Sequence, residues 1–543
     1  MSRTTSVLES SASAVELQRL GRDDQSTTNQ THNKSLWRDS WLARPIIIKA
    51  LPPQARLIMI GAIVSISGLL YGLDTGSIGP VTEMDQFYKT IGFIPSPALH
   101  GFFVASILLS ASISSLCSGF VADKISRRFG VFTGAVIFTI GATISASCSA
   151  FPALIVARLI TGIGAGQMIA VASIYLIEIA TSETRGKLAC MIQFCIAIGI
   201  MTGYFITYAT QRISSSLSWR LPFIVQASTS ALLALLIIAF VPFSPRWQAQ
   251  HHGEQAALDT LRKIRLPDFE TTSRSGNETL QSLQESQLQK EILEIRAAIT
   301  EARICRNSAR RGSSAGASSY KELFHRRYRK RTALGIFLMS AQQLSGVDVV
   351  LYFAPVVFSS LFSSQTASFL ASGVSGIILV VSTIPAQIYV DRWGRKPMMV
   401  GGGISMAACF LIIGSLFAKF ASIENNTVRL AQGPARWVVV VLIYLFLAIF
   451  SMTWAVVCRI YAAEVMPTRL RSKAAAGQQL ANWTTNFVVA LTAPSFLRAT
   501  PSGPYFFFSA CIAFTTLICF KFMIETKGRS LEQIDNLFDQ HNE

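Results

Sequence analysis

Two adjacent amide side chains, Gln342 and Gln343, and one carboxylate, Asp348, lie inside a long apolar stretch from about residue 332 to 362. A helix that spans hydrocarbon is mostly apolar, so polar groups at this depth are costly and must face protein or a water-filled cavity. With 3.6 residues per turn, Asp348 and Tyr352 share one helix face. Amides both donate and accept hydrogen bonds, which suits neutral hydroxyl groups. This stretch is therefore predicted to be a binding-site helix.

Two opposite charges, Asp74 and Arg158, lie inside other apolar stretches of the chain. An unpaired charge inside a membrane costs at least about 2.5 kcal/mol, so mutual pairing is the cheapest arrangement. Removing one partner of such a buried pair costs roughly 3–5 kcal/mol. A carboxylate that alternates between pairing with Arg158 and accepting a proton would couple solute movement to protons. A static structural salt bridge is the alternative interpretation.

The elements that must position these residues are long apolar helices. The chain has 543 residues, of which 51% are hydrophobic and 14% charged, and its mean hydropathy is +0.43. This composition indicates an all-α integral membrane protein, because soluble domains carry about 25% charged residues. Windows of 18 or more apolar residues predict twelve transmembrane helices, near residues 57–79, 98–122, 130–150, 153–177, 188–208, 220–242, 333–362, 367–390, 397–418, 436–460, 472–496 and 503–523.

The net charge of +18 follows the membrane topology rather than a nucleic-acid site. Of the 48 Lys and Arg residues, 39 fall in segments on the side of the N-terminus and 7 on the other side, with Arg158 and Arg459 inside helices. Cytosolic loops carry the excess of basic residues, so both termini and the long central loop are expected in the cytosol. The nine Cys residues show no paired spacing and are interpreted as buried apolar residues, not disulfides or metal ligands.

Two charge patterns occur once in each half of the chain. An acidic residue stands four positions before an arginine after the second and eighth predicted helices, and a Glu stands seven positions before an Arg after the fourth and tenth. The residues are Asp123, Arg127, Asp391, Arg395, Glu178, Arg185, Glu464 and Arg471. The repetition predicts two six-helix bundles related by an axis along the membrane normal, with a solute site between them at mid-depth.

The stretch from Gln342 to Tyr352 resembles the signature of the sugar porters, a branch of the major facilitator superfamily. The paired loops match the same family, and the resemblance extends from about residue 56 to 531. It implies the major facilitator fold and a secondary transporter that works by alternating access. It also implies that the loop charges, together with Arg246, bridge the two halves and close the cytosolic side. The implied solute ligands are Gln193, Gln342, Gln343, Asn482 and Trp483.

Three positions depart from the pattern of the sugar porters. Asp348 and Leu379 each stand in place of the usual Asn, and Arg459 stands in place of a Trp. A carboxylate and a guanidinium entering one site suggest that Asp348 and Arg459 pair with each other or hold a charged solute. Both are therefore assigned to the solute site, together with Tyr352. Asp74, in contrast, resembles the proton-linked members, since facilitators usually have Asn at this position.

The domain boundaries follow from the helix positions and the polar stretches between them. They are a cytosolic tail over 1–56, a six-helix bundle over 57–242, a cytosolic linker with short helices over 243–332, a second bundle over 333–524 and a cytosolic tail over 525–543. Asn425 begins an Asn-Asn-Thr sequence in an outward loop and is a predicted glycan acceptor. The wording of the first helix, from Asp74 to Pro80, resembles fungal sugar porters most.

The predicted function is proton-coupled transport of a sugar or a sugar-sized polar solute, by a monomer in the cell membrane. One alternative is a carrier or exporter of a non-sugar metabolite, zwitterionic or amine-bearing, because of the three departures. Another is a sugar sensor that does not transport, although sensors tend to have long cytosolic tails and nineteen residues follow Ile524. No phosphate-binding glycine loop, metal cluster or nucleophile–base pair supports an enzyme, a cofactor or an ATP-driven pump.

Overall fold

The chain is almost entirely helical in the part that the structure describes. In this computed structural model, the described residues are 51–92, 96–181, 184–266, 283, 285–297, 299–300, 322–325, 328–362, 364–424, 427–431, 433–466 and 470–527. Within these ranges the strands are β1 (Ala421–Glu424) and β2 (Thr427–Leu430), which pair antiparallel. Helices dominate because only a helix or a closed barrel satisfies every backbone polar group in hydrocarbon.

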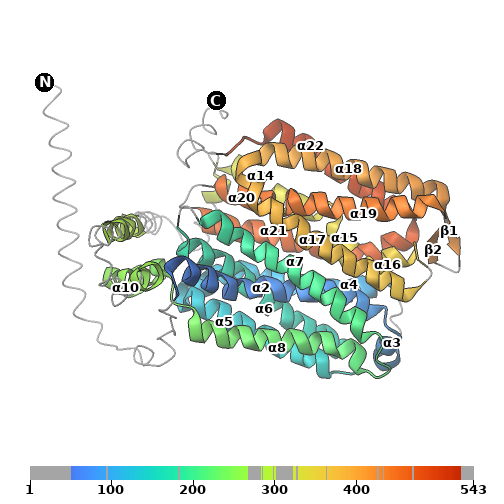
Figure 1. Ribbon diagram of the computed structural model, residues 1–543, viewed down its shortest axis with the longest axis horizontal. Coiled ribbons are helices and arrows are strands. Elements are labelled where there is room, and N and C mark those ends of the chain that lie inside the picture. Colours follow the sequence, from blue (N-terminus) through green and yellow to red (C-terminus); the bar gives the residue numbers. More distant parts are fainter. Residues whose placement is uncertain are drawn as a thin grey trace, which may run out of the picture. The chain divides into compact units, whose positions relative to one another are not determined.

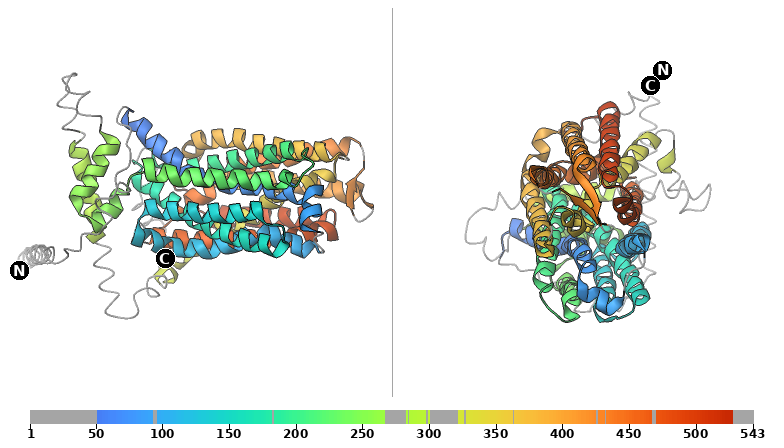
Figure 2. Two further views of the ribbon diagram at one scale, coloured as in Figure 1. Left: turned by 90° about the horizontal axis from the view of Figure 1, so that it is seen from below. Right: turned by 90° about the vertical axis from the view of Figure 1, so that its right-hand side faces the viewer.

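The first half of the chain forms one bundle, drawn blue to green in Figures 1 and 2. Its six long helices are α2 (Pro53–Thr82), α4 (Pro97–Ile125), α5 (Arg127–Ser147), α6 (Phe151–Ile179), α7 (Arg185–Thr210) and α8 (Leu217–Phe240). A short helix, α3 (Asp85–Ile91), precedes α4. Proline stands in the first turn of α2, α4 and α6, where its missing N–H has no intrahelical acceptor in any case.

The second half forms the other bundle, drawn yellow to red in Figure 1. Its helices are α14 (Arg329–Gln343), α15 (Val347–Tyr352), α16 (Ala354–Ser359), α17 (Gln365–Trp393), α18 (Arg395–Phe420), α19 (Pro434–Met452), α20 (Trp454–Glu464), α21 (Arg471–Ala499) and α22 (Gly503–Phe522). Three consecutive segments, α14 to α16, make the seventh crossing, and α19 with α20 makes the tenth.

The seventh crossing is broken, although the apolar pattern predicts one continuous helix over residues 333–362. Gly346 has a φ of +78° and lies between α14 and α15. A β-carbon there would meet the ring of Phe508 at 2.6 Å, so both the backbone conformation and the space require glycine. Phe353 separates α15 from α16. Irregular backbone is tolerated at this depth because it is buried in protein rather than exposed to lipid.

One crossing differs from the rest in its polarity. Among the described residues, eleven helical spans are long and apolar enough to cross a membrane, and α21 is not one of them despite its 29 residues. Gln478, Asn482 and Asn486 interrupt its apolar sequence, and all three are buried against other helices. These polar residues lower the hydropathy of α21, which is the eleventh crossing in chain order and brings the number of crossings among the described residues to twelve. The predicted fold class, an all-α membrane protein with twelve helices in two six-helix bundles, is confirmed.

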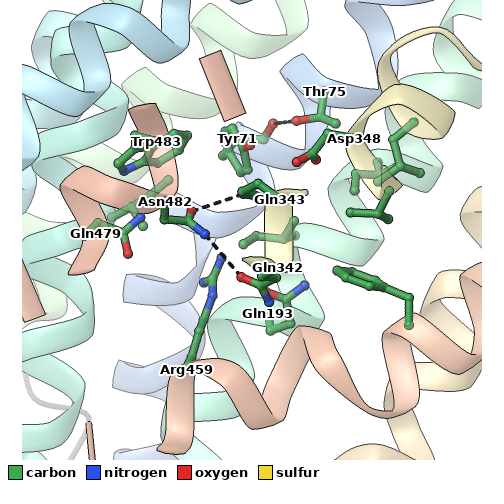
Figure 3. A pocket seen from close by; sticks show the side chains of 16 residues that line it. Tyr71, Thr75, Gln193, Gln342, Gln343, Asp348, Arg459, Gln479, Asn482 and Trp483 are labelled. Atoms are coloured by element: carbon green, nitrogen blue, oxygen red, sulfur yellow. Dashed lines mark hydrogen bonds between the residues drawn. The ribbon is translucent and has the colours of Figure 1, made fainter. Parts of the chain in front are cut away.

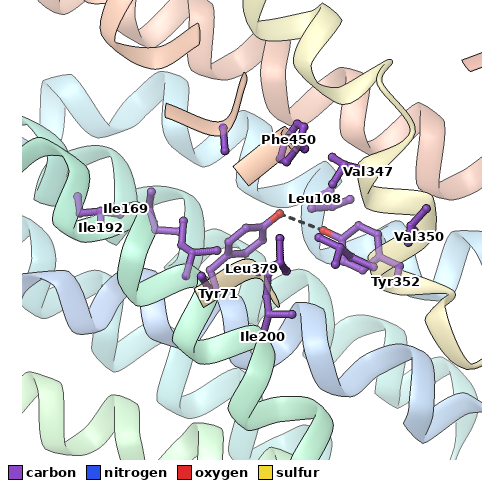
Figure 4. Packing of buried hydrophobic residues seen from close by; sticks show 14 of the residues in the cluster. Tyr71, Leu108, Ile169, Ile192, Ile200, Val347, Val350, Tyr352, Leu379 and Phe450 are labelled. Atoms are coloured by element: carbon purple, nitrogen blue, oxygen red, sulfur yellow. Dashed lines mark hydrogen bonds between the residues drawn. The ribbon is translucent and has the colours of Figure 1, made fainter. Parts of the chain in front are cut away.

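The two bundles meet along α4 with α21 and along α7 with α17. At the first contact, a β-carbon on Gly101 of α4 would lie 2.2 Å from the carbonyl oxygen of Leu491 on α21, so only glycine fits. Between the bundles, buried apolar side chains surround Tyr71 and Tyr352, whose hydroxyl oxygens lie 3.0 Å apart (Figure 4). The hydrophobic core is thus continuous from one bundle to the other.

The two ends of the bundles carry different elements (Figure 1). The short helices α9 (Pro245–His251) and α10 (Glu254–Arg265) lie at one end, called here the linker end. The β1–β2 hairpin lies at the opposite end, called here the hairpin end. At the linker end, the Arg56 guanidinium donates hydrogen bonds to the carbonyls of Lys263 and Leu266, at 2.9 and 3.0 Å. These bonds attach α10 to the start of α2.

Candidate functional site

A small cavity lies where the two bundles meet, and polar side chains line much of it (Figure 3). Helices α2, α6 and α7 of the first bundle and α14, α15, α19, α20 and α21 of the second contribute side chains. The lining residues are Tyr71, Thr75, Ile169, Gln193, Ile196, Ile200, Gln342, Gln343, Val347, Asp348, Leu351, Phe450, Arg459, Gln479, Asn482 and Trp483. Its volume of about 60 Å³ leaves room for only a few water molecules.

Three amide side chains form a connected network at the centre of this cavity. Asn482 donates to the Gln342 side-chain oxygen at 3.2 Å, and Gln343 donates to the Asn482 side-chain oxygen at 3.2 Å. Gln342 also donates to the carbonyl of Trp454 at 3.0 Å, where the tenth crossing is interrupted between α19 and α20. Each amide is thereby held in one orientation. The structure brings together the amides of helices α14 and α21 that the sequence assigned to the solute site.

Two further assigned residues present unsatisfied polar atoms at this cavity. The Oε1 of Gln193 and the Nε1 of Trp483 are buried and have no hydrogen-bond partner among the described residues. A buried donor or acceptor without a partner costs about 1–3 kcal/mol. Trp483 also meets the ring of Tyr71 edge-on, with centroids 5.0 Å apart. These two residues therefore offer an acceptor, a donor and an aromatic platform to a hydroxylated ligand.

The two charged residues that depart from the sugar-porter pattern, Asp348 and Arg459, both line the cavity. Asp348 comes from the short helix α15 and is 7% exposed, whereas Arg459 comes from α20 and is half-buried. They form no ion pair with each other, and the Oδ2 of Asp348 and the Nε of Arg459 lack hydrogen-bond partners in the described part of the chain. Of the two possibilities that the sequence left open, direct pairing is therefore not observed.

One assigned residue, Tyr352, stands apart from the cavity lining. Its side chain is 1% exposed, and its hydroxyl group shares a hydrogen bond with that of Tyr71, which does line the cavity. The Tyr204 hydroxyl group donates a hydrogen bond to the backbone carbonyl of Leu351, the residue before Tyr352. These bonds attach α15 to α2 and α7 of the other bundle. Contact of Tyr352 with a solute stays a prediction, and its observed contacts are between the bundles.

Asp74 and Arg158 form a bidentate ion pair inside the first bundle. Their nitrogen–oxygen distances are 3.0 and 3.1 Å, and each residue is only 1% exposed. Arg158 donates further hydrogen bonds to the carbonyls of Phe103 and Val104, at 3.1 and 3.2 Å. A buried charge pair is stable when the geometry is good and the remaining donors are satisfied, and both conditions hold here. The part that the pair plays in proton coupling stays a prediction.

Charged residues at the linker end pair within the first bundle. Arg127 contacts Glu178 at 3.0 Å and Asp123 at 2.8 Å, so one guanidinium joins α4, α5 and α6. Ser244 also donates a hydrogen bond to the carboxylate of Glu178. Arg246, on the neighbouring helix α9, makes no ion pair with any residue that the structure describes.

The second bundle repeats this arrangement at the same end. Arg395 contacts Glu464 at 2.9 Å, and Thr526 donates to Glu464 at 2.6 Å. Glu525 accepts hydrogen bonds from the backbone N–H groups of Arg395 and Lys396 at 2.9 and 3.0 Å. Burial opposes ionisation of Glu525, but these backbone donors outweigh it and lower the pKa of the carboxyl group.

The described linker-end ion pairs each join helices of the same half. The reason is geometric, because the end of the fourth or tenth crossing lies beside the loop that follows the second or eighth crossing of its own bundle. Bridging of the two halves, which the resemblance implies for a closed cytosolic side, stays a prediction. The side chains of Arg185, Asp391 and Arg471 and the whole of Asn425 lie outside the described residues.

Sequence reasoning missed three polar residues of the cavity. Tyr71 and Thr75 lie one turn apart on α2, and Gln479 lies one turn before Asn482 on α21. A search for polar residues three or four positions from the assigned ligands would have found Gln479. No such signal marks Tyr71, whose place in the cavity depends on how α2 is rotated. Among the described residues, no group of His, Cys, Asp and Glu could hold a metal ion.

The sequence matches a known family over most of its length. The family described as "Sugar (and other) transporter" matches residues 60–538. The High-affinity glucose transporter 1 of Candida albicans is 28% identical over 500 residues, which cover 90% of this chain and 87% of that protein. The High glucose sensor RGT2 of Saccharomyces cerevisiae is 30% identical over 512 residues, which cover 91% of this chain and 62% of that protein.

The fold matches solved structures as well. The proton:xylose symporter XylE of E. coli, bound to 6-bromo-6-deoxy-D-glucose, aligns with a TM-score of 0.70 and 26% sequence identity. The match covers 89% of this chain and 99% of that chain. The similarity therefore includes both bundles.

Proposed function

Because this chain belongs to the sugar transporter family, we propose that it moves a sugar-sized polar solute through the amide-lined cavity, driven by protons. It is a multi-pass membrane protein that works as a secondary active transporter and not as an enzyme. The relatives that transport glucose and the symporter XylE support a sugar as the solute and the proton as the coupling ion.

The observation that carries this proposal is the position of the amide network. Gln342, Gln343 and Asn482 lie at the contact of the two bundles, in a cavity that both bundles line. A site of this kind can open to either side of the membrane when the bundles rotate against each other. Gln193 and Trp483 add the unpaired acceptor and donor that a hydroxylated solute would satisfy. We infer that these five residues contact the solute.

Asp74 is the proposed proton site. Protonation removes its negative charge, and Arg158 then keeps only its hydrogen bonds to the Phe103 and Val104 carbonyls of α4. The attachment of α2 to α6 is weakened by this loss, while Arg158 stays attached to α4. Because Thr75, the neighbour of Asp74, lines the cavity, a shift of α2 changes the solute site directly. Proton and solute are thereby coupled through one helix.

The linker-end ion pairs have a different proposed part in alternating access. Arg127 with Glu178 and Arg395 with Glu464 hold the linker end of each bundle together. Each bundle can then move as one body, which is what rocking of two repeats around a central site requires. We also propose contacts between the two bundles when the linker end is closed. The residues proposed to make them are Arg185, Arg246, Asp391 and Arg471.

The orientation in the membrane follows from charge. The basic residues gather in segments on the side of the linker end, which supports a cytosolic linker end and cytosolic termini. The hairpin end then faces outward, with Asn425 as a proposed glycan site. We propose that the protein acts as a monomer in the cell membrane, with the domain boundaries given by the twelve crossings.

The proposal is tested by reconstituting the purified chain into liposomes. We expect counterflow of labelled D-glucose or D-xylose, and accumulation of the sugar when the outside is made acidic. Asp74→Asn should abolish the acid-driven accumulation but keep the counterflow, because Asn can still accept a hydrogen bond from Arg158. The control is Glu83→Gln, which removes a carboxylate from the end of α2 and should leave both activities unchanged.

Two results would contradict the proposal. Wild-type protein that gives neither counterflow nor acid-driven accumulation, for any sugar tried, would exclude transport of a sugar. Acid-driven accumulation that survives in Asp74→Asn would remove Asp74 as the coupling residue.

A signalling function is the second candidate, and the similarity to the glucose sensor RGT2 favours it. A sensor of this fold would bind solute without moving it across the membrane. Thermal stabilisation by a sugar, measured on the same preparation that shows no counterflow, would support the sensor.

A further inference from the structure

The charge inventory of the central cavity differs from that of a site for a neutral sugar. Among its lining residues Asp348 is the one acidic side chain and Arg459 the one basic side chain. They come from α15 and α20 of the second bundle. In Figure 3, Asp348 and Arg459 lie on opposite sides of the amides Gln343 and Asn482.

Both charged groups are incompletely satisfied by the protein. The Oδ2 of Asp348 and the Nε of Arg459 are buried atoms without a hydrogen-bond partner in the described part of the chain. Elsewhere in the same protein, Asp74 and Arg158 satisfy each other with two hydrogen bonds. Other arginines, such as Arg128 and Arg436, also have one unpartnered guanidinium nitrogen, but Asp348 is the one acidic residue in the described part of the chain with a buried carboxylate oxygen that lacks a partner. The unmatched carboxylate is therefore a feature of the cavity.

We propose that Asp348 and Arg459 make this cavity a site for a small hydroxylated zwitterion, whose ammonium group contacts Asp348 and whose carboxylate contacts Arg459. The inference rests on the proposed function, since it takes the cavity as the transport site. A carboxylate accepts hydrogen bonds from an ammonium group, and a guanidinium donates two parallel bonds to a carboxylate. The amides between the two charges are left to contact the hydroxyl groups.

Other solute charges match this site less well. A neutral sugar would displace water from both charges and leave each without a counter-ion. An anion would pair with Arg459 but bring like charge toward Asp348. A cation would do the reverse. Only a solute with both charges neutralises both residues.

The test compares four linear six-carbon probes that differ in charge. They are D-glucitol (neutral), D-glucamine (cationic), D-gluconate (anionic) and 6-amino-6-deoxy-D-gluconate (zwitterionic, with its hydroxyl groups between the two charges). Binding to the purified full-length protein is measured by thermal stabilisation over a concentration series, because a ligand of the folded state raises stability with its concentration. We expect the zwitterion to bind at least about tenfold more tightly than each other probe. D-glucitol binding as tightly as the zwitterion would overturn the inference without any variant.

Two variants assign the charges to their residues. Asp348→Asn should shift the preference toward D-gluconate, and Arg459→Gln should shift it toward D-glucamine. The matched controls, Glu83→Gln and Arg498→Gln, remove the same charges near the hairpin end and should leave the order of the probes unchanged. If both cavity variants weaken all probes equally, the charges do not recognise the solute and the inference is wrong.

Counterflow in liposomes separates this inference from the proposed function. Counterflow of the zwitterion in preference to D-glucitol supports both. Preferential binding of the zwitterion without counterflow keeps the ligand assignment and overturns transport. Counterflow of D-glucose or D-glucitol with no preference among the charged probes keeps transport and overturns the ligand assignment.

Discussion

The opposite charges Asp74 and Arg158 are arranged differently from the opposite charges Asp348 and Arg459 at the cavity. In the first bundle, Asp74 and Arg158 contact each other through two hydrogen bonds and are almost completely buried. At the cavity, Asp348 and Arg459 remain apart, with a buried atom of each unsatisfied. The first pair satisfies itself and acts on helix packing. The second is incomplete without a ligand.

The comparison predicts its largest effect on stability when one charge is removed from each pair. Asp74→Ala leaves Arg158 buried without its counter-ion, so the free energy of unfolding should fall by about 3–5 kcal/mol. Asp348→Ala removes a carboxylate whose Oδ2 has no hydrogen-bond partner among the described residues, and the free energy of unfolding should change by less than about 1 kcal/mol. Thermal and denaturant unfolding in detergent measure both. Equal losses in the two variants would remove the distinction between the pairs.

Double-mutant cycles sharpen the same comparison. For Asp74 and Arg158 we expect an interaction energy of about 2–3 kcal/mol, because the two groups contact directly. For Asp348 and Arg459 we expect less than about 0.5 kcal/mol without ligand, since they form no contact. Saturating 6-amino-6-deoxy-D-gluconate should raise this second value by bridging the two charges. A large interaction energy in the absence of any ligand would mean that Asp348 and Arg459 pair with each other in solution.

The linker-end pairs allow a smaller comparison between the two bundles. The Glu178 side chain is 9% exposed, whereas that of Glu464 is 28% exposed. Glu178→Gln should therefore cost about 1–2 kcal/mol of unfolding free energy and Glu464→Gln less than about 1 kcal/mol, because water screens the second pair. Unfolding in detergent at low and high salt checks the order. A larger salt effect on the first pair would contradict the assignment.

Two carboxyl groups outside the membrane spans give effects that depend on pH. Burial raises the pKa of Glu83 from 4.5 to about 7, with Arg498 opposing the shift. The folded state then keeps a proton that the unfolded state has released, so stability falls as pH rises from about 4.5 to 7. We expect a slope of about 0.5–1 kcal/mol per pH unit that Glu83→Gln removes.

Glu525 should change stability with pH in the opposite direction to Glu83. Its pKa is lowered by backbone donors, so its contribution is present above its ordinary pKa and is lost as pH falls. Glu525→Gln should therefore weaken the protein at neutral pH and have little effect in acid. Unfolding midpoints across this pH range measure both groups, and slopes of equal sign would contradict the two shifts.

Much of the site could be predicted from individual residues. Gln342, Gln343 and Asn482 are amides in apolar helices, and the cost of burying them already implied a shared polar cavity. The pairing of Asp74 with Arg158 followed from the same cost. The break at Gly346 could not be predicted, because a glycine within an apolar run also fits close helix packing. The separation of Asp348 from Arg459 depends on that break and on the depth of α20.

The sequence by itself determined the membrane class, the twelve crossings and the residues that could not face lipid. It could do so because hydrocarbon penalises each polar group strongly, so composition alone decides where a residue must be buried. Only the tertiary structure decided that Asp348 and Arg459 do not meet. That outcome depends on helix rotation, depth and the interrupted seventh crossing, each of which changes the distance between two side chains without changing the pattern of apolar residues.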